Sequence, residues 1–286
     1  MSAYTHVTIK AHGLNLHVVQ AGPPDGALVL LLHGYPEYWG IWQPQLDFLA
    51  QKGFYAWSVD LRGYHPSEQA LSLADYTLDA LAADVLALIA AAGRERATLV
   101  AHDWGGMVAF WTAQKHGARL DKLAVFNAPV PGVFNQVFWR SRAQFSASAY
   151  VLFFQLPFLP EWYLARGDYA FPARIMQRSA VRGTFTDEIL EKHKMIWRQP
   201  GTMRAMLNYY RALWQRPSPP PANPRISTPT LLVWGARDHW LTPELAEKSI
   251  ALCDAGRLET WQDSKHWSVQ EYPERVNTVL AEFLGC

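Results

Sequence analysis

Five predominantly apolar runs constrain the fold of this chain more than any other feature. A strand that helices cover on both faces has no solvent side, so the parallel strands of α/β proteins are apolar throughout. The runs lie at 27–32, 54–59, 97–101, 122–126 and 230–234, with helix-length segments between most of them. This rhythm predicts an α/β protein with a mostly parallel, doubly wound sheet.

Two further segments support this organisation. Residues 5–22 alternate apolar and polar side chains on either side of His12-Gly13, a pattern typical of an antiparallel hairpin. Residues 78–89 place apolar side chains on one face at helical spacing, and Gly93 follows where a helix would end. We therefore expect a hairpin before the parallel strands and a helix between the second and third runs.

The rhythm of strand and helix breaks at residue 131. From there to residue 223 the chain is rich in aromatic residues and has no run that could extend the sheet. The proline cluster at 217–221 cannot continue a helix and predicts an extended linker back to the next strand. We predict a core domain formed by residues 1–130 and 224–286, with residues 131–223 inserted as a helical cap.

Composition bears on partners and location. Charged residues make up 18% of the chain and the net charge is +1, so the whole-chain charge favours neither a nucleic-acid nor a membrane partner. The N-terminus has no basic flank followed by an apolar stretch, and we expect a soluble, cytoplasmic protein. Cys253 and Cys286 show no metal-ligand spacing, and we expect no cofactor and no metal. A homodimer is compatible with the sequence.

The turn after the third run carries an acidic residue. In the segment from Leu99 to Gly106 an apolar strand passes through a sharp turn, with Asp103 at its apex, into a helix. Such a nucleophile turn brings strand and helix close together and needs small residues on both sides of the apex. Ala101, Gly105 and Gly106 meet this need. We predict that Asp103 is a nucleophile, the alternative being that it caps the following helix.

A carboxylate at this apex favours a particular chemistry. Serine is the usual occupant and attacks acyl carbons, whereas a carboxylate attacking an acyl carbon would form a reactive anhydride. Displacement at an sp³ carbon instead gives an ordinary ester, which water can cleave. The natural leaving groups are a halide and the strained oxygen of an epoxide.

Cleavage of such an ester needs a base, which we assign to His266. It lies in a loop before the last predicted helix, and Asp238 follows the strand at 230–234, where its carboxylate can orient an imidazole. The three residues follow one another along the chain as nucleophile, acid and histidine, which is the order of Ser, Asp and His in proteins with this kind of turn. His33 and His102 adjoin turns, and we expect them to brace loops by hydrogen bonding.

Two backbone N–H groups are predicted to form an oxyanion hole. One belongs to Trp104, directly after the nucleophile, and the other to Tyr35, in the loop after the first run. Pro36 would hold that loop in a fixed conformation, either trans or cis.

At these residues the chain resembles the epoxide hydrolases of the α/β-hydrolase fold. The resemblance covers nearly the whole chain and rests on the segments 33–37 (HGYPE), 60–64 (DLRGY) and 102–106 (HDWGG), with the late Asp238 and His266. It implies the α/β-hydrolase fold, a small apolar epoxide and water as substrates, and a vicinal diol as product. At His65-Pro66 the chain departs from the family pattern, in which a glycine and a small polar stretch are more usual.

The resemblance also implies two cap tyrosines that protonate the epoxide oxygen. It places one at Tyr210 and, in a looser match, the other at Tyr150, with Tyr163 and Tyr169 as alternatives to Tyr150. Tyr209 lies about 100° round the helix from Tyr210, so both are not expected to face one pocket. The cap is aromatic, which favours an apolar or aryl substrate. The predicted substrate-binding residues are Trp104, Tyr150, Tyr210, Pro36 and Phe153.

Two other functions are compatible with the sequence. A haloalkane dehalogenase would use the same Asp103, with Trp104 as one halide donor and a second donor from a cap tryptophan: Trp139, Trp162, Trp197 or Trp214. A non-catalytic ligand-binding protein could keep the pocket on the same fold. We rank epoxide hydrolysis first.

Overall fold

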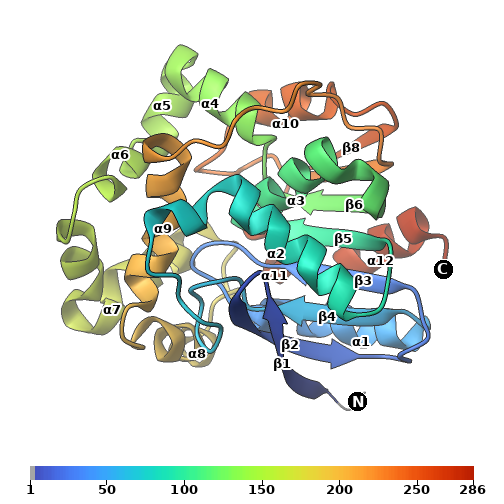
Figure 1. Cartoon of the computed structure of the whole chain (residues 1–286). Coiled ribbons are helices and arrows are strands. Elements are labelled where there is room, and N and C mark those ends of the chain that lie inside the picture. The colour runs from blue at the N-terminus through green and yellow to red at the C-terminus, as the bar shows by residue number, and fades with distance from the viewer. Residues whose placement is uncertain (1–3) are drawn as a thin grey trace.

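A single eight-stranded sheet organises the computed structural model, which describes residues 4–286 (Figure 1). The strands follow the spatial order β1-β2-β4-β3-β5-β6-β7-β8, with the pairs β1–β2 and β2–β4 antiparallel and the other pairs parallel. Their bounds are β1 Thr5–Ala11, β2 Leu14–Ala21, β3 Leu28–Leu32, β4 Tyr55–Val59, β5 Ala97–His102, β6 Leu120–Phe126, β7 Thr230–Gly235 and β8 Gly256–Trp261.

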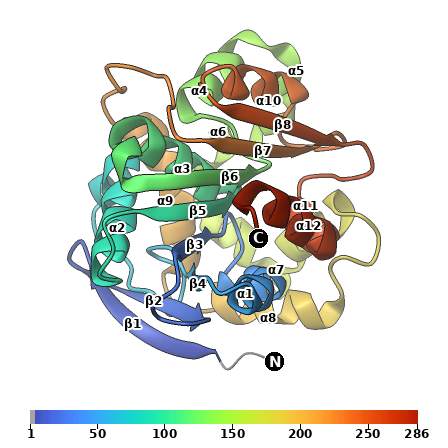
Figure 2. The same cartoon turned by 90° about the vertical axis from the view of Figure 1, so that its right-hand side faces the viewer.

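Helices cover both faces of the sheet, as Figure 2 shows. On one face lie α2 and α3, and on the other α1, α11 and α12. Each face buries its own apolar cluster, so the parallel strands have no solvent side. The core helices are α1 Gln43–Gln51, α2 Leu78–Ala91, α3 Asp103–His116, α10 Pro243–Ile250, α11 Ser268–Glu271 and α12 Pro273–Leu284, with short 3₁₀ turns at Trp39–Trp42, Leu73–Tyr76 and Gly117–Arg119.

Six helices lie between β6 and β7, and the described residues contain no strand in this interval. We call them the inserted helices: α4 Pro131–Arg140, α5 Arg142–Ser148, α6 Tyr150–Phe154, α7 Leu159–Ser179, α8 Asp187–Trp197 and α9 Thr202–Gln215. They gather beyond one end of the sheet (Figure 1). Backbone at 166–169 is non-helical, so α7 consists of two helical pieces. The division into two domains at 130/131 and 223/224 stays a prediction.

The α/β-hydrolase architecture expected from the sequence is confirmed. All five apolar runs are strands, the hairpin is β1 and β2, and the helix at 78–89 is α2. The strand β8 was not predicted from the sequence, because this edge strand is half exposed and carries Arg257 and Glu259 rather than an apolar run. No helix within residues 4–286 is both long enough and apolar enough to cross a membrane.

Candidate active site

Asp103 lies at the apex of a strained turn between β5 and α3. Its φ is +47°, a left-handed conformation that costs energy for a residue with a side chain. The turn fits only because its neighbours are small. A side chain at Gly34 would overlap with Asp103 itself, and one at Gly105 would overlap with the carbonyl oxygens of Leu32 and His33. The absence of side chains at Gly34 and Gly105 therefore leaves the space that this turn needs.

The loop after β3 approaches Asp103 from the neighbouring strand. The sheet reverses its strand order between β3 and β5, and such a switch point leaves a crevice at the carboxyl ends of the strands. The Tyr35 N–H donates a hydrogen bond to Asp103 Oδ1 at 2.8 Å. The Tyr35-Pro36 bond is cis. Trp104 is the second residue of α3, where backbone N–H groups have no partner within the helix.

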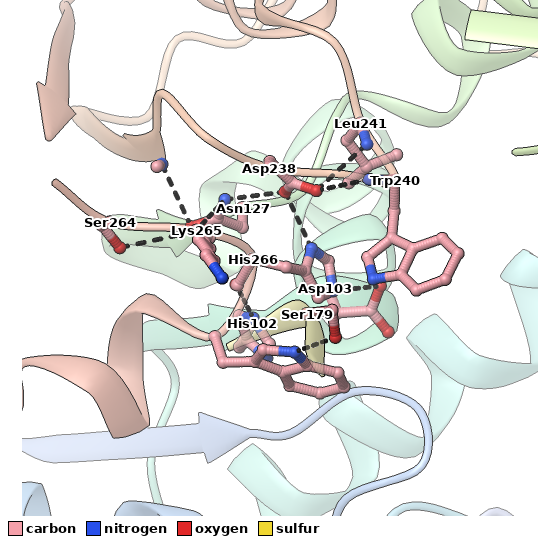
Figure 3. A network of polar contacts seen from close by, with 12 residues as sticks. His102, Asp103, Asn127, Ser179, Asp238, Trp240, Leu241, Ser264, Lys265 and His266 are labelled. Atoms are coloured by element: carbon pink, nitrogen blue, oxygen red, sulfur yellow. Dashed lines mark hydrogen bonds and ion pairs between the residues drawn. The ribbon is translucent and has the colours of Figure 1, made fainter. Parts of the chain in front are cut away.

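His266 lies between two carboxylates (Figure 3). Its Nδ1 donates to Asp238 Oδ2 at 2.8 Å, and its Nε2 is 3.5 Å from Asp103 Oδ2. The structure thus brings together the three residues that the sequence singled out from the ends of β5, β7 and β8.

Hydrogen bonds fix the Asp238 carboxylate in one orientation. Its Oδ1 accepts the N–H groups of Trp240 (2.8 Å) and Leu241 (3.1 Å), and its Oδ2 accepts the Asn127 amide at 2.8 Å (Figure 3). Asn127 also donates to the Lys265 carbonyl oxygen at 3.2 Å, next to His266. Asn127 was not among the site residues predicted from the sequence. The available signal was its position at the carboxyl end of β6, the strand between those of Asp103 and Asp238.

The two carboxylates determine the protonation of the imidazole. Burial disfavours a charged ring, but the charges of Asp238 and Asp103 outweigh this effect and raise the pKa of His266 well above its ordinary value. Burial likewise opposes the charge of Asp238, yet the imidazolium lowers the pKa of that carboxyl. The site therefore holds a protonated imidazole between two carboxylates.

A second buried pair supports the site from behind. The His102 ring donates to Glu37 Oε2 at 2.8 Å and to the His266 carbonyl oxygen at 2.9 Å. Glu37 Oε2 also accepts the Gly34 N–H at 2.7 Å. Both nitrogens of His102 face acceptors, which suits a protonated ring, and Glu37 raises its pKa although burial opposes this.

His33 braces the neighbouring loop. Its Nδ1 donates to the Gly34 carbonyl oxygen at 2.9 Å, and its Nε2 accepts the Leu61 N–H at 3.2 Å. Together with the contacts of His102, these bonds confirm the bracing role expected for both histidines.

An apolar cavity of about 290 Å³ opens onto these groups. Asp103 and His266 lie in its wall together with side chains from the loop after β3, the inserted helices and the loop after β7. The lining residues are Tyr35, Pro36, Asp103, Tyr150, Phe153, Phe154, Tyr163, Leu164, Phe171, Pro172, Ile175, Met176, Tyr210, Trp240, His266 and Trp267.

Tyr150 and Tyr210 share one wall of this cavity. Their ring centroids are 6.1 Å apart and their hydroxyls interact. Burial, and then the negative charge of Asp103, raise the pKa of Tyr150, and burial likewise raises the pKa of Tyr210. Both phenols therefore keep their protons at neutral pH.

The other tyrosines near Tyr210 differ in position. Tyr209 points away and donates its hydroxyl to the Arg62 carbonyl oxygen at 2.8 Å, in agreement with the expected helical offset. Tyr163 lies in the cavity wall, whereas Tyr169 packs against Trp197 and is not among the lining residues.

Of the five predicted substrate-binding residues, four line the cavity: Pro36, Tyr150, Phe153 and Tyr210. The Trp104 ring instead packs against Tyr210, with ring centroids 5.0 Å apart, and is not among the lining residues. Sequence reasoning missed Trp240 and the α7 residues Pro172, Ile175 and Met176. The sequence of α7 mixes apolar and charged residues, and this pattern does not indicate which face of the helix lines a cavity.

The cap tryptophans considered as halide donors are not lining residues either. Trp139 and Trp162 are mostly exposed, with 59% and 58% of their surface accessible. Trp197 donates its indole N–H to the Pro36 carbonyl oxygen, and Trp214 donates to Asn135. Within residues 4–286, no three His, Cys, Asp or Glu side chains cluster as ligands for a metal ion.

Comparisons with known proteins agree with this geometry. The family model for the alpha/beta hydrolase fold matches residues 27–273. The chain is 36% identical to the AB hydrolase superfamily protein YfhM of Bacillus subtilis over 96% of both chains. It is 33% identical to epoxide hydrolase 4 of Homo sapiens over 99% of this chain and 79% of that protein. An epoxide hydrolase of Bacillus megaterium, solved with an inhibitor, superposes with a TM-score of 0.89 at 27% identity and covers 98% of this chain and 100% of its own. The chain therefore belongs to the α/β-hydrolase fold family, and within it to the group that contains these epoxide hydrolases.

Proposed function

We propose that the protein hydrolyses epoxides to vicinal diols through a covalent ester on Asp103. One observation carries this proposal: a carboxylate at the nucleophile turn and two protonated phenols line the same apolar cavity. A carboxylate can open an epoxide only if the departing oxygen receives a proton, and a phenol is acidic enough to supply it. The relatives named as epoxide hydrolases support the same reaction.

In the first step Asp103 attacks one carbon of the epoxide ring. A bond forms between the carboxylate oxygen and that carbon, the ring C–O bond breaks, and the released oxygen takes a proton from Tyr150 or Tyr210. The Tyr35 N–H holds Oδ1 of the carboxylate, which directs Oδ2 towards the cavity and His266. Proton donation of this kind accelerates a reaction by roughly 10² to 10⁴.

Formation of the ester removes the negative charge of Asp103. One of the two carboxylates that raise the pKa of His266 is then neutral, so the pKa falls and the imidazole becomes able to act as a base. The proton that it releases restores the phenol. His266 next takes a proton from water, with Asp238 holding the ring.

The resulting hydroxide attacks the carbonyl carbon of the ester. The N–H groups of Tyr35 and Trp104 stabilise the negative oxygen that forms there, an effect worth about 3 kcal/mol for each donor in comparable sites. Collapse of this intermediate releases the diol, which takes up the proton from His266, and leaves Asp103 as a carboxylic acid. Asp103 then passes its proton to His266, which restores the carboxylate and the protonated imidazole of the starting state.

The cavity favours a small, apolar and aryl-bearing epoxide. Its volume of about 290 Å³ is at the lower end of ligand sites, which span roughly 300 to 1,000 Å³. Rings of Phe153, Phe154 and Trp240 form much of the wall, so an aryl group can make edge-to-face contacts there.

Trapping of the ester tests the proposal. The His266→Gln variant, incubated with styrene oxide, should accumulate protein heavier by one epoxide molecule in intact-mass spectrometry, because attack proceeds while hydrolysis stalls. The Asp103→Ala/His266→Gln double variant is the matched control and should gain no mass. A His266→Gln protein that stays unmodified while the wild type forms diol would contradict the two-step route.

The same assay separates epoxide from halide chemistry. Wild-type protein should convert styrene oxide to diol and release no bromide from bromobutane. Bromide release without diol would assign the site to dehalogenation instead.

A further inference from the structure

Exposed large apolar side chains are concentrated on the inserted helices. Of the eleven in residues 4–286, eight lie on these helices, two (Leu156 and Phe158) lie in the loop between α6 and α7, and only Leu71 lies outside residues 131–223. Six of them lie in the loop before α7 and on α7 itself, and we call this group the α7 patch. Its members, with their exposed fractions, are Leu156 44%, Phe158 71%, Leu159 46%, Trp162 58%, Tyr163 38% and Phe171 43%. An exposed apolar patch of this kind marks an interaction surface.

The patch is continuous with the wall of the active-site cavity. Tyr163 and Phe171 belong to both, with ring centroids 5.0 Å apart. Tyr163 also contacts Phe153, deeper in the cavity, at 5.9 Å. Whatever covers the patch therefore lies against the cavity.

Charge is divided unequally between the two parts of the chain. Residues 131–223 hold 12 of the 26 Lys and Arg residues but only 5 of the 25 Asp and Glu residues, a net charge of +7. The remaining residues carry −6, so the whole-chain value of +1 conceals the asymmetry. The expectation of no membrane partner, which rested on the whole-chain charge, does not take account of this division.

The cations lie on the patch itself, whereas its acids are paired. Arg166 is 4.9 Å from the Trp162 ring and Arg204 is 5.8 Å from the Phe158 ring. The nearby acid Glu161 forms an ion pair with Arg211 at 2.7 Å. Asp168, after the first piece of α7, is paired with Arg198 and Lys194.

We propose that the α7 patch docks the protein on the surface of an anionic lipid bilayer. Tryptophan, tyrosine and phenylalanine insert at the level of the headgroups, and arginines beside them meet the lipid phosphates. A second copy of the chain is the other candidate, but a symmetric dimer through this patch would bring two segments of charge +7 together. An anionic bilayer complements both the rings and the charge.

Vesicle flotation tests this docking. The full chain is mixed with vesicles of phosphatidylcholine alone, or of phosphatidylcholine and phosphatidylglycerol, and the protein that floats is measured. We expect at least tenfold more binding to the anionic vesicles, with most of it lost in 1 M salt, where charges are screened beyond about 3 Å. Absence of wild-type binding to anionic vesicles overturns the proposal.

Substitutions locate the contact. Phe158→Ser/Trp162→Ser should lower binding at least tenfold, and Arg166→Gln or Arg204→Gln each about fivefold. Leu71→Ser and Lys52→Gln are matched controls on the core, since Leu71 is fully exposed and Lys52 lies 5.9 Å from the Phe48 ring. Equal losses in the controls would refute the assignment to the patch.

Two further measurements distinguish the alternatives. Light scattering that shows a dimer dissociated by Phe158→Ser/Trp162→Ser, with vesicles unbound, would assign the patch to a second copy and reject the proposal. Turnover of a small water-soluble epoxide should be unchanged in the patch variants, because neither Phe158 nor Trp162 lines the cavity. Vesicle binding is read without turnover, so its outcome is independent of the proposed reaction.

Discussion

The sheet and the inserted helices hold their reactive groups in different ways. At the sheet, directional hydrogen bonds leave each side chain one position: Asp238 accepts four, and the Tyr35 N–H orients Asp103. On the inserted helices, Tyr210 lies among aromatic rings, with centroids 5.1 Å from Phe154 and 5.4 Å from Tyr35. Hydrogen bonds between individual atoms therefore fix the reactive side chains at the sheet, whereas packing against neighbouring rings fixes those on the inserted helices.

This difference predicts that the two regions tolerate substitutions differently. A hydrogen-bonded carboxylate at the end of a strand tolerates almost no change, because loss of one partner leaves a buried polar group unsatisfied. A wall of rings accepts substitutions of similar volume at small cost. Changes at the sheet should therefore remove the chemistry, whereas changes on the helices should slow one step or alter the choice of substrate.

The largest effect is expected for Asp103→Ala. Without the nucleophile no ester can form, and removal of a group that acts in concert with others typically lowers turnover on the order of 10⁶-fold. Steady-state diol formation from styrene oxide measures this. Asp121→Ala, an exposed carboxylate paired with Arg96, is the control and should retain full activity. Substantial residual turnover in Asp103→Ala would mean that water attacks the epoxide directly.

Loss of one phenol should have an intermediate effect. Tyr210→Phe or Tyr150→Phe should slow ring opening by roughly 10² to 10⁴, since the packed ring remains and only the proton donor is lost. Single-turnover alkylation of Asp103 measures this step. Tyr209→Phe is a matched control: it loses a bond to the Arg62 carbonyl oxygen, so stability falls by about 1 kcal/mol while alkylation continues. Unchanged alkylation in both cavity variants would remove the phenols from the mechanism.

The same difference explains what could be predicted from the sequence. Strands buried on both faces and a turn that admits only small residues leave local signals, so the positions of Asp103, Asp238 and His266 could be inferred from chain order. Their distances could not, because these depend on the loops after three strands that are far apart in sequence. Asn127 was missed since a lone asparagine after a strand has many ordinary roles.

The inserted helices left weaker signals. Their aromatic content predicted an apolar cavity, and the family resemblance placed Tyr150 and Tyr210 in its wall. Neither could assign Met176 or Ile175 to the cavity, because α7 breaks at 166–169 and its second piece takes a new direction. The face that a helix presents depends on such breaks, and helical periodicity alone does not reveal them.

The Glu37 and His102 pair predicts a pH-dependent stability. Burial raises the pKa of Glu37, but His102 outweighs burial and lowers this pKa from 4.5 to about 2. The stabilisation of the fold by the ionised Glu37 is therefore complete above pH 4.5 and is lost as the pH falls from 4.5 to about 2. The pKa of His102 is raised above 6.5, so its contribution is complete below 6.5 and lost as pH rises through the raised value. The pair therefore stabilises the fold most between about pH 4.5 and 6.5.

Glu37→Gln should lower the free energy of unfolding by about 1 to 3 kcal/mol in that window, and by less outside it. Urea unfolding across pH, taken as the difference from wild type, isolates this pair from other titrating groups. Asp121→Asn disrupts an exposed ion pair and should change stability by less than about 1 kcal/mol. An equal loss at every pH would show that packing, and not charge, holds Glu37.

The smallest effect is expected at the mouth of the cavity. Tyr163 shares the wall with Tyr150 and Tyr210 and is the one other inserted-helix tyrosine among the lining residues, but 38% of its surface is exposed. A phenol in contact with water competes with the solvent for the epoxide oxygen, and its ring, not its hydroxyl, makes the contacts with Phe153 and Phe171. Tyr163→Phe should therefore change single-turnover alkylation by no more than about twofold, as for a surface substitution. A hundredfold loss would instead place the proton donor at the mouth, and the distinction between the buried phenols and the exposed ring would fail.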